Sequence, residues 1–197
     1  MKMNGYSTHQ PLLVAAMVHT DGPILEIGGG FYSTPLISAF ANGQMRRALT
    51  LDTSEYFVGI LKDLQSDYHR IEQIPGIPFD PIGKFSPESG RKAAYYVGLQ
   101  QDVLEQNPGP FSVVFVDQGP GFLRAPAVKF YADRAEFIVV HDTNHAERYR
   151  FGLMSNFAYR WDFTAHIPFT TVVSNVRDCS IFRYLNPCGH VASDLRT

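Results

Sequence analysis

Four acidic residues stand where short apolar runs end, and carboxylates in such places can accept hydrogen bonds from a ligand or take up a proton. They are Glu26, Asp52, Asp117 and Asp142. The apolar runs are typical of strands in a parallel sheet, and an open α/β sheet binds its ligand at the carboxyl ends of its strands. A single acid of this kind is more often a solvated loop residue or a helix cap. The four together favour a shared polar crevice.

Three glycines follow the first of these runs, in the segment Ile24-Leu25-Glu26-Ile27-Gly28-Gly29-Gly30. Glycine lets the backbone turn sharply and approach a ligand, and the N-terminus of the next helix offers free N–H groups. Asp52 ends the following strand, where an acid can accept hydrogen bonds from both hydroxyls of a ribose. These residues predict a ligand that contains a nucleoside. Ser33 replaces the last glycine of the dinucleotide fingerprint, which argues against a dinucleotide.

Apolar runs and helix signals alternate along the chain, as in βαβ units. We expect strands at 24–27, 48–51, 68–74, 111–116 and 137–140, and a late hairpin of strands at 162–167 and 179–185. We expect helices at 10–19, 33–43 (closed by Asn42-Gly43), 53–64, 91–107, 125–134 and 146–159. Residues 75–90 are rich in Pro and Gly and predict an irregular excursion, which can act as a substrate lid. The whole chain, 1–197, is predicted to be one α/β domain.

Composition excludes several classes of protein. Hydrophobic residues make up 45% and charged residues 18% of the chain, which favours a packed core over disorder. The net charge is −2 without a run of Lys or Arg, so neither nucleic acid nor an acidic membrane is an expected partner. The two cysteines lack metal-binding spacing, no apolar stretch could span a bilayer, and the N-terminus lacks the core of a signal peptide. We expect a cytoplasmic protein.

The segment from Ile24 to Pro35 resembles the first motif of the class I S-adenosylmethionine (SAM)-dependent methyltransferases, an acid, one residue and then glycines after the first strand. The segment 111–143 resembles the same family. The resemblance implies a doubly wound, mostly parallel seven-stranded sheet (a Rossmann-like methyltransferase fold) with a C-terminal antiparallel hairpin. It implies SAM as the cofactor, with Glu26 orienting its methionine part and Asp52 binding its ribose. The cofactor-binding residues so expected are Glu26, Gly28, Gly29, Gly30, Ser33, Thr34, Asp52, Thr53, Asp117 and Gln118.

Residues after the strand at 137–140 are the candidates for catalysis. Methyl transfer from a sulfonium needs an acceptor lone pair near the methyl group and often a base that removes the acceptor's proton. His141, Asp142 and His145 can serve as that base. The alternative is structural, with His141 packing or capping and His145 on the surface of a helix.

Some O-methyltransferases resembling catechol O-methyltransferase bind Mg²⁺ through an acid after strand 4 and an Asp-Asn pair after strand 5. Asp117 and Asp142 match these positions, but Thr143 stands where the Asn would follow. Mg²⁺ is therefore possible, but we assign no metal ligands. His9 can reach the active site from the N-terminal segment, or it is a surface residue near a helix cap. Arg124 can hold an anionic substrate, or it is a surface residue.

The sequence thus predicts a SAM-dependent methyltransferase that modifies an oxygen or nitrogen of a small polar molecule. A nicotinamide-dependent oxidoreductase on a similar fold and a non-catalytic module that binds SAM or a nucleoside are the alternatives. The expected partner is a small-molecule acceptor, with no nucleic acid and no membrane, and a homodimer is left open.

Overall fold

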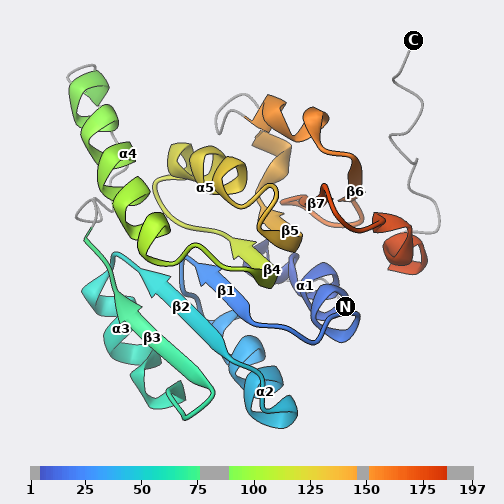
Figure 1. The fold of residues 1–197 in the computed structure, drawn as a ribbon, viewed down its shortest axis with the longest axis horizontal. Coiled ribbons are helices and arrows are strands. Elements are labelled where there is room, and N and C mark those ends of the chain that lie inside the picture. The colour runs from blue at the N-terminus through green and yellow to red at the C-terminus, as the bar shows by residue number, and fades with distance from the viewer. Residues whose placement is uncertain (1–4, 76–88, 146–150, 186–197) are drawn as a thin grey trace.

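A single seven-stranded sheet forms the centre of the molecule (Figure 1). A computed structural model describes residues 5–75, 89–145 and 151–185. The strands lie in the order β3-β2-β1-β4-β5-β7-β6. They are β1 (Ile24–Ile27), β2 (Ala48–Asp52), β3 (His69–Gln73), β4 (Phe111–Val116), β5 (Ala135–His141), β6 (Tyr159–Phe163) and β7 (Thr170–Ser174). The first five pair in parallel, and β7 is antiparallel to both β5 and β6. This confirms the predicted mostly parallel sheet with an antiparallel ending.

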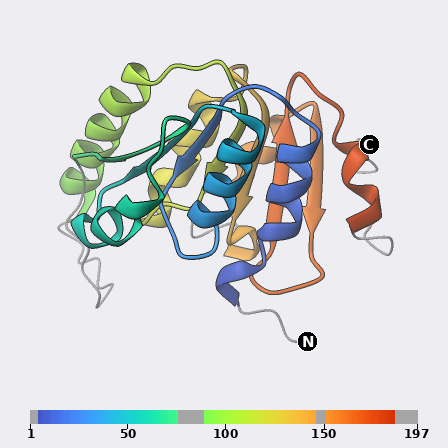
Figure 2. The same ribbon diagram turned by 90° about the horizontal axis from the view of Figure 1, so that it is seen from below.

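Helices cover both faces of the sheet (Figure 2). The α-helices are α1 (Gln10–Val18), α2 (Thr34–Gln44), α3 (Glu55–Leu61), α4 (Ser89–Gln106) and α5 (Arg124–Phe130). Short 3₁₀ helices are η1 (Gly5–Ser7), η2 (Lys62–Leu64), η3 (Gly121–Leu123), η4 (Thr143–His145), η5 (Phe151–Asn156) and η6 (Cys179–Leu185). One core cluster joins α1, α2 and η6 to the sheet, and the other joins α4, α5 and η5 to its opposite face. The described part of the chain contains no helix both long and apolar enough to cross a membrane.

Successive residues of the central strands belong alternately to the two core clusters. Val113 and Phe115 of β4 belong to the cluster under α1, whereas Val114 and Val116 belong to the cluster under α5, and all four are fully buried. Side chains alternate between the faces of a strand, so a strand covered on both faces must be apolar throughout. The continuous apolar runs in the sequence have this cause.

The second strand of the predicted hairpin was placed wrongly. Residues 179–185 form η6, and the hairpin partner of β6 is β7 (Thr170–Ser174). Cys179 and Phe182 are both buried and lie three residues apart, which is helical spacing, and Phe182 packs edge-on against Phe137 with ring centroids 5.1 Å apart. Every residue of β7 is buried, and its Thr-Thr-Val-Val run carries a β-branched signal that could have identified it.

Two predicted helix boundaries also need correction. The helix expected at 146–159 is wrong at its described end, since η5 is a 3₁₀ helix and Tyr159 begins β6; residues 146–150 lie outside the described residues. Asn42-Gly43 does not close α2, which continues to Gln44 and ends at Met45 with φ +52°. The Asn42 side-chain amide donates back to the Ser38 carbonyl oxygen, one helical turn earlier, at 2.8 Å, and the helix continues past it. Most of the 75–90 excursion, residues 76–88, also lies outside the described residues.

A buried arginine fixes the end of α1 to the start of β1. The guanidinium of Arg46 donates to the carbonyl oxygens of Met17 (2.7 Å) and Gly22 (2.8 and 3.0 Å) and to the Thr20 hydroxyl (3.0 Å). Only 6% of Arg46 is exposed, and burial lowers its pKa from the ordinary value. The side chain thereby supplies donors to carbonyl oxygens at the end of α1 and in the turn that leads to β1.

We expect Arg46→Met to lower the free energy of unfolding by about 2–4 kcal/mol, because it removes the guanidinium hydrogen bonds to the Met17 and Gly22 carbonyl oxygens. The neighbouring Arg47 is exposed, so Arg47→Met is the matched control and should stay within about 0.5 kcal/mol of the parent protein. Urea unfolding followed by circular dichroism measures both. Equal losses for the two variants would contradict the anchoring role of Arg46.

Candidate functional site

The glycine turn after β1 has a different steric demand at each position. Gly28 has φ +96°, and a Cβ there would lie 2.5 Å from the Gln118 backbone, closer than any side-chain atom can approach. A Cβ at Gly29 would meet Leu61 at 3.1 Å. Among the described residues, a Cβ at Gly30 would meet only the Ser33 hydroxyl, at an ordinary 3.6 Å. Chain packing therefore requires glycine at position 28, is tight at 29 and leaves room beside 30.

Asp52, at the end of β2, holds this turn in place. Its Oδ2 accepts a hydrogen bond from the Gly29 N–H at 2.7 Å, and its Oδ1 accepts one from the Ser54 N–H at 2.6 Å. Burial raises the pKa of Asp52, and its backbone hydrogen bonds oppose that shift. The backbone N–H of Thr53 also donates to this carboxylate, which still keeps a lone pair for a further donor. Thr53, next in the chain, is half-buried.

Glu26 is the buried centre of the turn. Its Oε2 accepts hydrogen bonds from the hydroxyls of Thr34 (2.8 Å) and Thr50 (2.7 Å). Its Oε1 is buried without a hydrogen-bond partner among the described residues. Burial raises the pKa of Glu26 to about 7, against the nearby hydroxyls of Ser33, Thr50 and Thr34, which lower it. A buried carboxyl with one orphaned oxygen lacks a donor that a ligand or a water can supply.

Two polar neighbours of Glu26 were not predicted from the sequence. The Thr50 hydroxyl uses its one proton on Glu26, so it must accept the hydrogen bond that joins it to His69 Nε2 at 2.8 Å. Burial lowers the pKa of His69 to about 4, so its ring is neutral at pH 7. Both residues lie inside strands, where the sequence offers no signal that distinguishes them from other polar strand residues.

Arg124 joins the ends of β4 and β5. Its guanidinium donates to the carboxylates of Asp117 (2.9 Å) and Asp142 (2.8 Å) and to the carbonyl oxygens of Asp117 (3.2 Å), Gln118 (3.0 Å) and His141 (2.9 Å). Arg124 is therefore neither a surface residue nor an open anion site. It also bridges the two carboxylates considered for Mg²⁺, which places a cation between them.

His141 is buried beside Asp117. Its Nδ1 lies 3.2 Å from Asp117 Oδ2, and its Nε2 lies 3.0 Å from the Thr8 hydroxyl. Asp117 is about a quarter exposed at its side chain. Burial would raise its pKa, but the hydrogen bond with His141 and the charge of Arg124 lower it. The structure thus brings Asp117, His141 and Asp142 together, as predicted.

His9 enters the same cluster from the start of α1. Its ring contacts His141 edge-on at 4.9 Å between centroids and Phe115 at 4.7 Å. Only 1% of His9 is exposed, which excludes the surface alternative. Burial, assisted by His141, lowers the pKa of His9 to about 4, whereas Asp117 raises it. The ring is therefore neutral at pH 7.

The remaining predicted residues lie around these two groups. His145 is exposed at the end of η4, and its backbone N–H donates to the Asp142 carbonyl at 3.1 Å. Asp142 adopts φ +60°, a left-handed conformation that Asp tolerates better than most residues. Gln118 is buried, and its amide donates to the Leu123 carbonyl at 3.1 Å. Catalytic roles for His141, Asp142 and His145 stay predictions.

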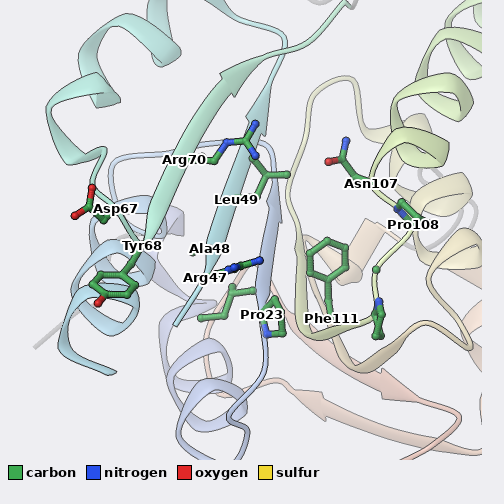
Figure 3. Close-up of a pocket in the computed structure, with 13 residues that line it drawn as sticks. Pro23, Arg47, Ala48, Leu49, Asp67, Tyr68, Arg70, Asn107, Pro108 and Phe111 are labelled. Atoms are coloured by element: carbon green, nitrogen blue, oxygen red, sulfur yellow. The ribbon is translucent and has the colours of Figure 1, made fainter. Parts of the chain in front are cut away.

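A surface hollow of about 540 Å³ lies at the other end of the sheet (Figure 3). Arg47 and Leu49, near the start of β2, and Phe111, at the start of β4, line it. The glycine turn, Asp52 and Asp117 stand at the opposite ends of these strands. Because open parallel sheets bind ligands at the carboxyl ends of their strands, this hollow is not the candidate site.

Solved structures with this fold identify the fold family. The chain is similar to cofactor-bound Rv0187 from MTB (16% identity, 89% of this chain and 83% of that chain covered, TM-score 0.59). It is similar to a putative O-methyltransferase from Klebsiella pneumoniae (12%, 89% and 82%, TM-score 0.58). It is also similar to the O-methyltransferase from Bacillus cereus in complex with SAH (16%, 88% and 82%, TM-score 0.56).

No protein-family model and no curated protein sequence matches the chain. At these sequence identities, the structural similarity is evidence for the fold alone. The chain has the fold of the class I SAM-dependent methyltransferases, as its first motif and its strand-end acids predicted.

Proposed function

We propose that the protein is a SAM-dependent methyltransferase that acts on an oxygen or nitrogen of a small polar molecule. The observation that carries this proposal is the turn at residues 28–30, where a sterically required glycine and Asp52 hold the backbone beside a buried Glu26. In the part of the chain that the structure describes, Glu26 Oε1 lacks a hydrogen-bond partner. The solved structures of similar fold include O-methyltransferases, one in complex with SAH, which supports the same conclusion.

The residues present fit SAM. SAM supplies a sulfonium methyl group, which is electrophilic. Glu26 Oε1 would accept a hydrogen bond from the cofactor's ammonium, directly or through a water, and so satisfy an orphaned buried atom. The Asp52 carboxylate would accept hydrogen bonds from the ribose hydroxyls. The space beside Gly30 lets the cofactor approach the backbone.

Exposed aromatic side chains adjoin the glycine turn and suit a ligand with a flat ring. Phe31, 58% exposed, lies edge-on to Phe57 at 5.7 Å between ring centroids, and Tyr56 lies edge-on to Phe57 at 5.5 Å. Phe31 follows the turn directly, and Tyr56 and Phe57 belong to α3, which begins shortly after Asp52. We propose that these rings contact the adenine or the acceptor.

Asp142 and His145 are the proposed groups on the acceptor side. The Asp142 carboxylate is about a quarter exposed, and His145 is exposed at the same end of β5. Either can accept a proton from a bound acceptor. His141 is 3% exposed, so we propose that it acts through Asp117 and Asp142 as a positioning residue.

Calorimetric titration with SAH tests the cofactor site. Asp52→Ala should weaken binding about 10- to 100-fold, because it removes a charged acceptor for two hydroxyls. Asp67→Ala is the matched control, since Asp67 is an exposed acid that lines the hollow at the other end of the sheet. Its affinity should equal that of the parent protein.

A weakening confined to Asp67→Ala would place the ligand in the hollow and contradict the site. Failure of the parent protein to bind SAM or SAH at millimolar concentration would refute the proposed function. Thermal unfolding of Asp52→Ala shows whether its turn still folds, and Asp52→Asn, which retains one oxygen, should lose less affinity.

The pKa of Glu26 makes cofactor affinity depend on pH. The free protein holds the Glu26 proton up to about pH 7, whereas an ammonium beside the carboxylate favours its charged form. The complex therefore binds fewer protons, and affinity should rise with pH by up to about tenfold per unit between pH 5 and 7. Calorimetry across this range measures the slope.

Glu26→Gln cannot titrate and supplies the control for that slope. Its affinity should stay flat over the same pH range. A slope of the same size in Glu26→Gln would show that another group, or SAM itself, releases the proton.

Turnover is measured separately, as SAH formation over a panel of hydroxyl and amine acceptors. Cofactor binding without turnover would favour the non-catalytic alternative.

A further inference from the structure

The strongest unexplained feature is the buried group of His9, Asp117 and His141. One ligand atom from each of these residues lies within 4.8 Å of the others. They come from the start of α1 and from the ends of β4 and β5, so the fold, and not local sequence, brings them together.

The hydrogen bonds of Thr8 fix the role of His141 Nε2 as a donor. The Thr8 hydroxyl has one proton, and its carbonyl neighbours, Pro168 at 2.7 Å and Gly5 at 3.4 Å, can only accept it. The hydroxyl must therefore accept from His141 Nε2. Nδ1 of the same ring faces Asp117 Oδ2 at 3.2 Å. A bound metal ion would take the place of the Nδ1 proton between these two atoms.

His9 is the second anomaly of this group. Both of its ring nitrogens are buried, and neither has a hydrogen-bond partner among the described residues. A neutral imidazole offers one donor and one acceptor, and leaving such groups unpaired in the interior is unfavourable. One of its ring nitrogens lies within 4.8 Å of the ligand atoms of Asp117 and His141, within reach of the same cation.

The local charges also leave room for a cation. Asp117 and Asp142 contribute two negative charges, and Arg124 neutralises one of them through Asp117 Oδ1 and Asp142 Oδ2. Asp117 Oδ2 faces His141 instead of Arg124. A net negative charge thus remains on the side of the carboxylate that faces the two imidazoles.

We propose that His9, Asp117 and His141 form a binding site for a divalent first-row transition metal such as Zn²⁺. Two imidazole nitrogens and one carboxylate oxygen suit Zn²⁺, Co²⁺ or Fe²⁺, whereas Mg²⁺ prefers oxygen ligands alone. Donor atoms around Zn²⁺ lie about 3.3 Å apart, so the His9 ring would move inward on binding. Thr8 would then orient His141 from the outside, as a hydrogen-bond partner of a ligand commonly does.

Metal titration of tag-free, chelator-treated full-length protein tests this site. We expect the parent protein to bind one equivalent of Zn²⁺ by calorimetry and to develop visible Co²⁺ absorption bands. His9→Phe keeps a ring against Phe115 and removes one ligand, so affinity should fall by at least about 100-fold. His19→Phe makes the same change at an exposed histidine just after α1 and should leave affinity unchanged.

The Co²⁺ form offers a second measurement that needs no variant. Its proton NMR spectrum should contain paramagnetically shifted resonances from two imidazole rings. No binding by the parent protein, equal binding by a folded His9→Phe, or shifted resonances from fewer than two rings would overturn the proposal. Because binding is measured without SAM, these results are independent of the proposed methyl transfer.

Discussion

The guanidinium of Arg124 is the interaction on which the carboxyl edge of the sheet depends. Every N–H of its planar fork meets an acceptor supplied by residues 117, 118, 141 or 142, which follow two neighbouring strands. One oxygen of each carboxylate meets the guanidinium, and charge-assisted hydrogen bonds of this kind fix geometry as well as charge. The carboxylates of Asp117 and Asp142 are held in place by this one side chain, and so is the left-handed backbone at Asp142.

A second constraint joins that edge to the glycine turn. Gly28 approaches the backbone of Gln118 so closely that no side chain fits between them. Gln118 is in turn bound to Arg124, so the turn after β1 and the loop after β4 have one fixed spacing. Glu26 lies beneath this contact and Asp52 beside it. The cofactor-binding half and the acceptor half of the proposed site are therefore parts of one rigid edge.

Much of this arrangement could be predicted from local sequence. Apolar runs predicted the central strands, because both faces of the sheet are covered. The glycines and acids near the ends of those runs predicted its carboxyl edge. The mistakes have physical causes as well. Residues 179–185 are as apolar as a strand, but Cys179 and Phe182 use helical spacing to pack on the core. The pairing of Arg124 with two acids and the burial of His9 arise from contacts between distant segments, which one sequence does not display.

The most direct test of this account is a crystal structure of the full chain bound to SAH. We expect the ribose hydroxyls at the Asp52 carboxylate, the amino-acid part over residues 28–30 with its ammonium within reach of Glu26 Oε1, and the sulfur facing the ends of β4 and β5. A ligand in the hollow lined by Arg47 and Phe111, or one that leaves Asp52 and Glu26 untouched, would contradict it.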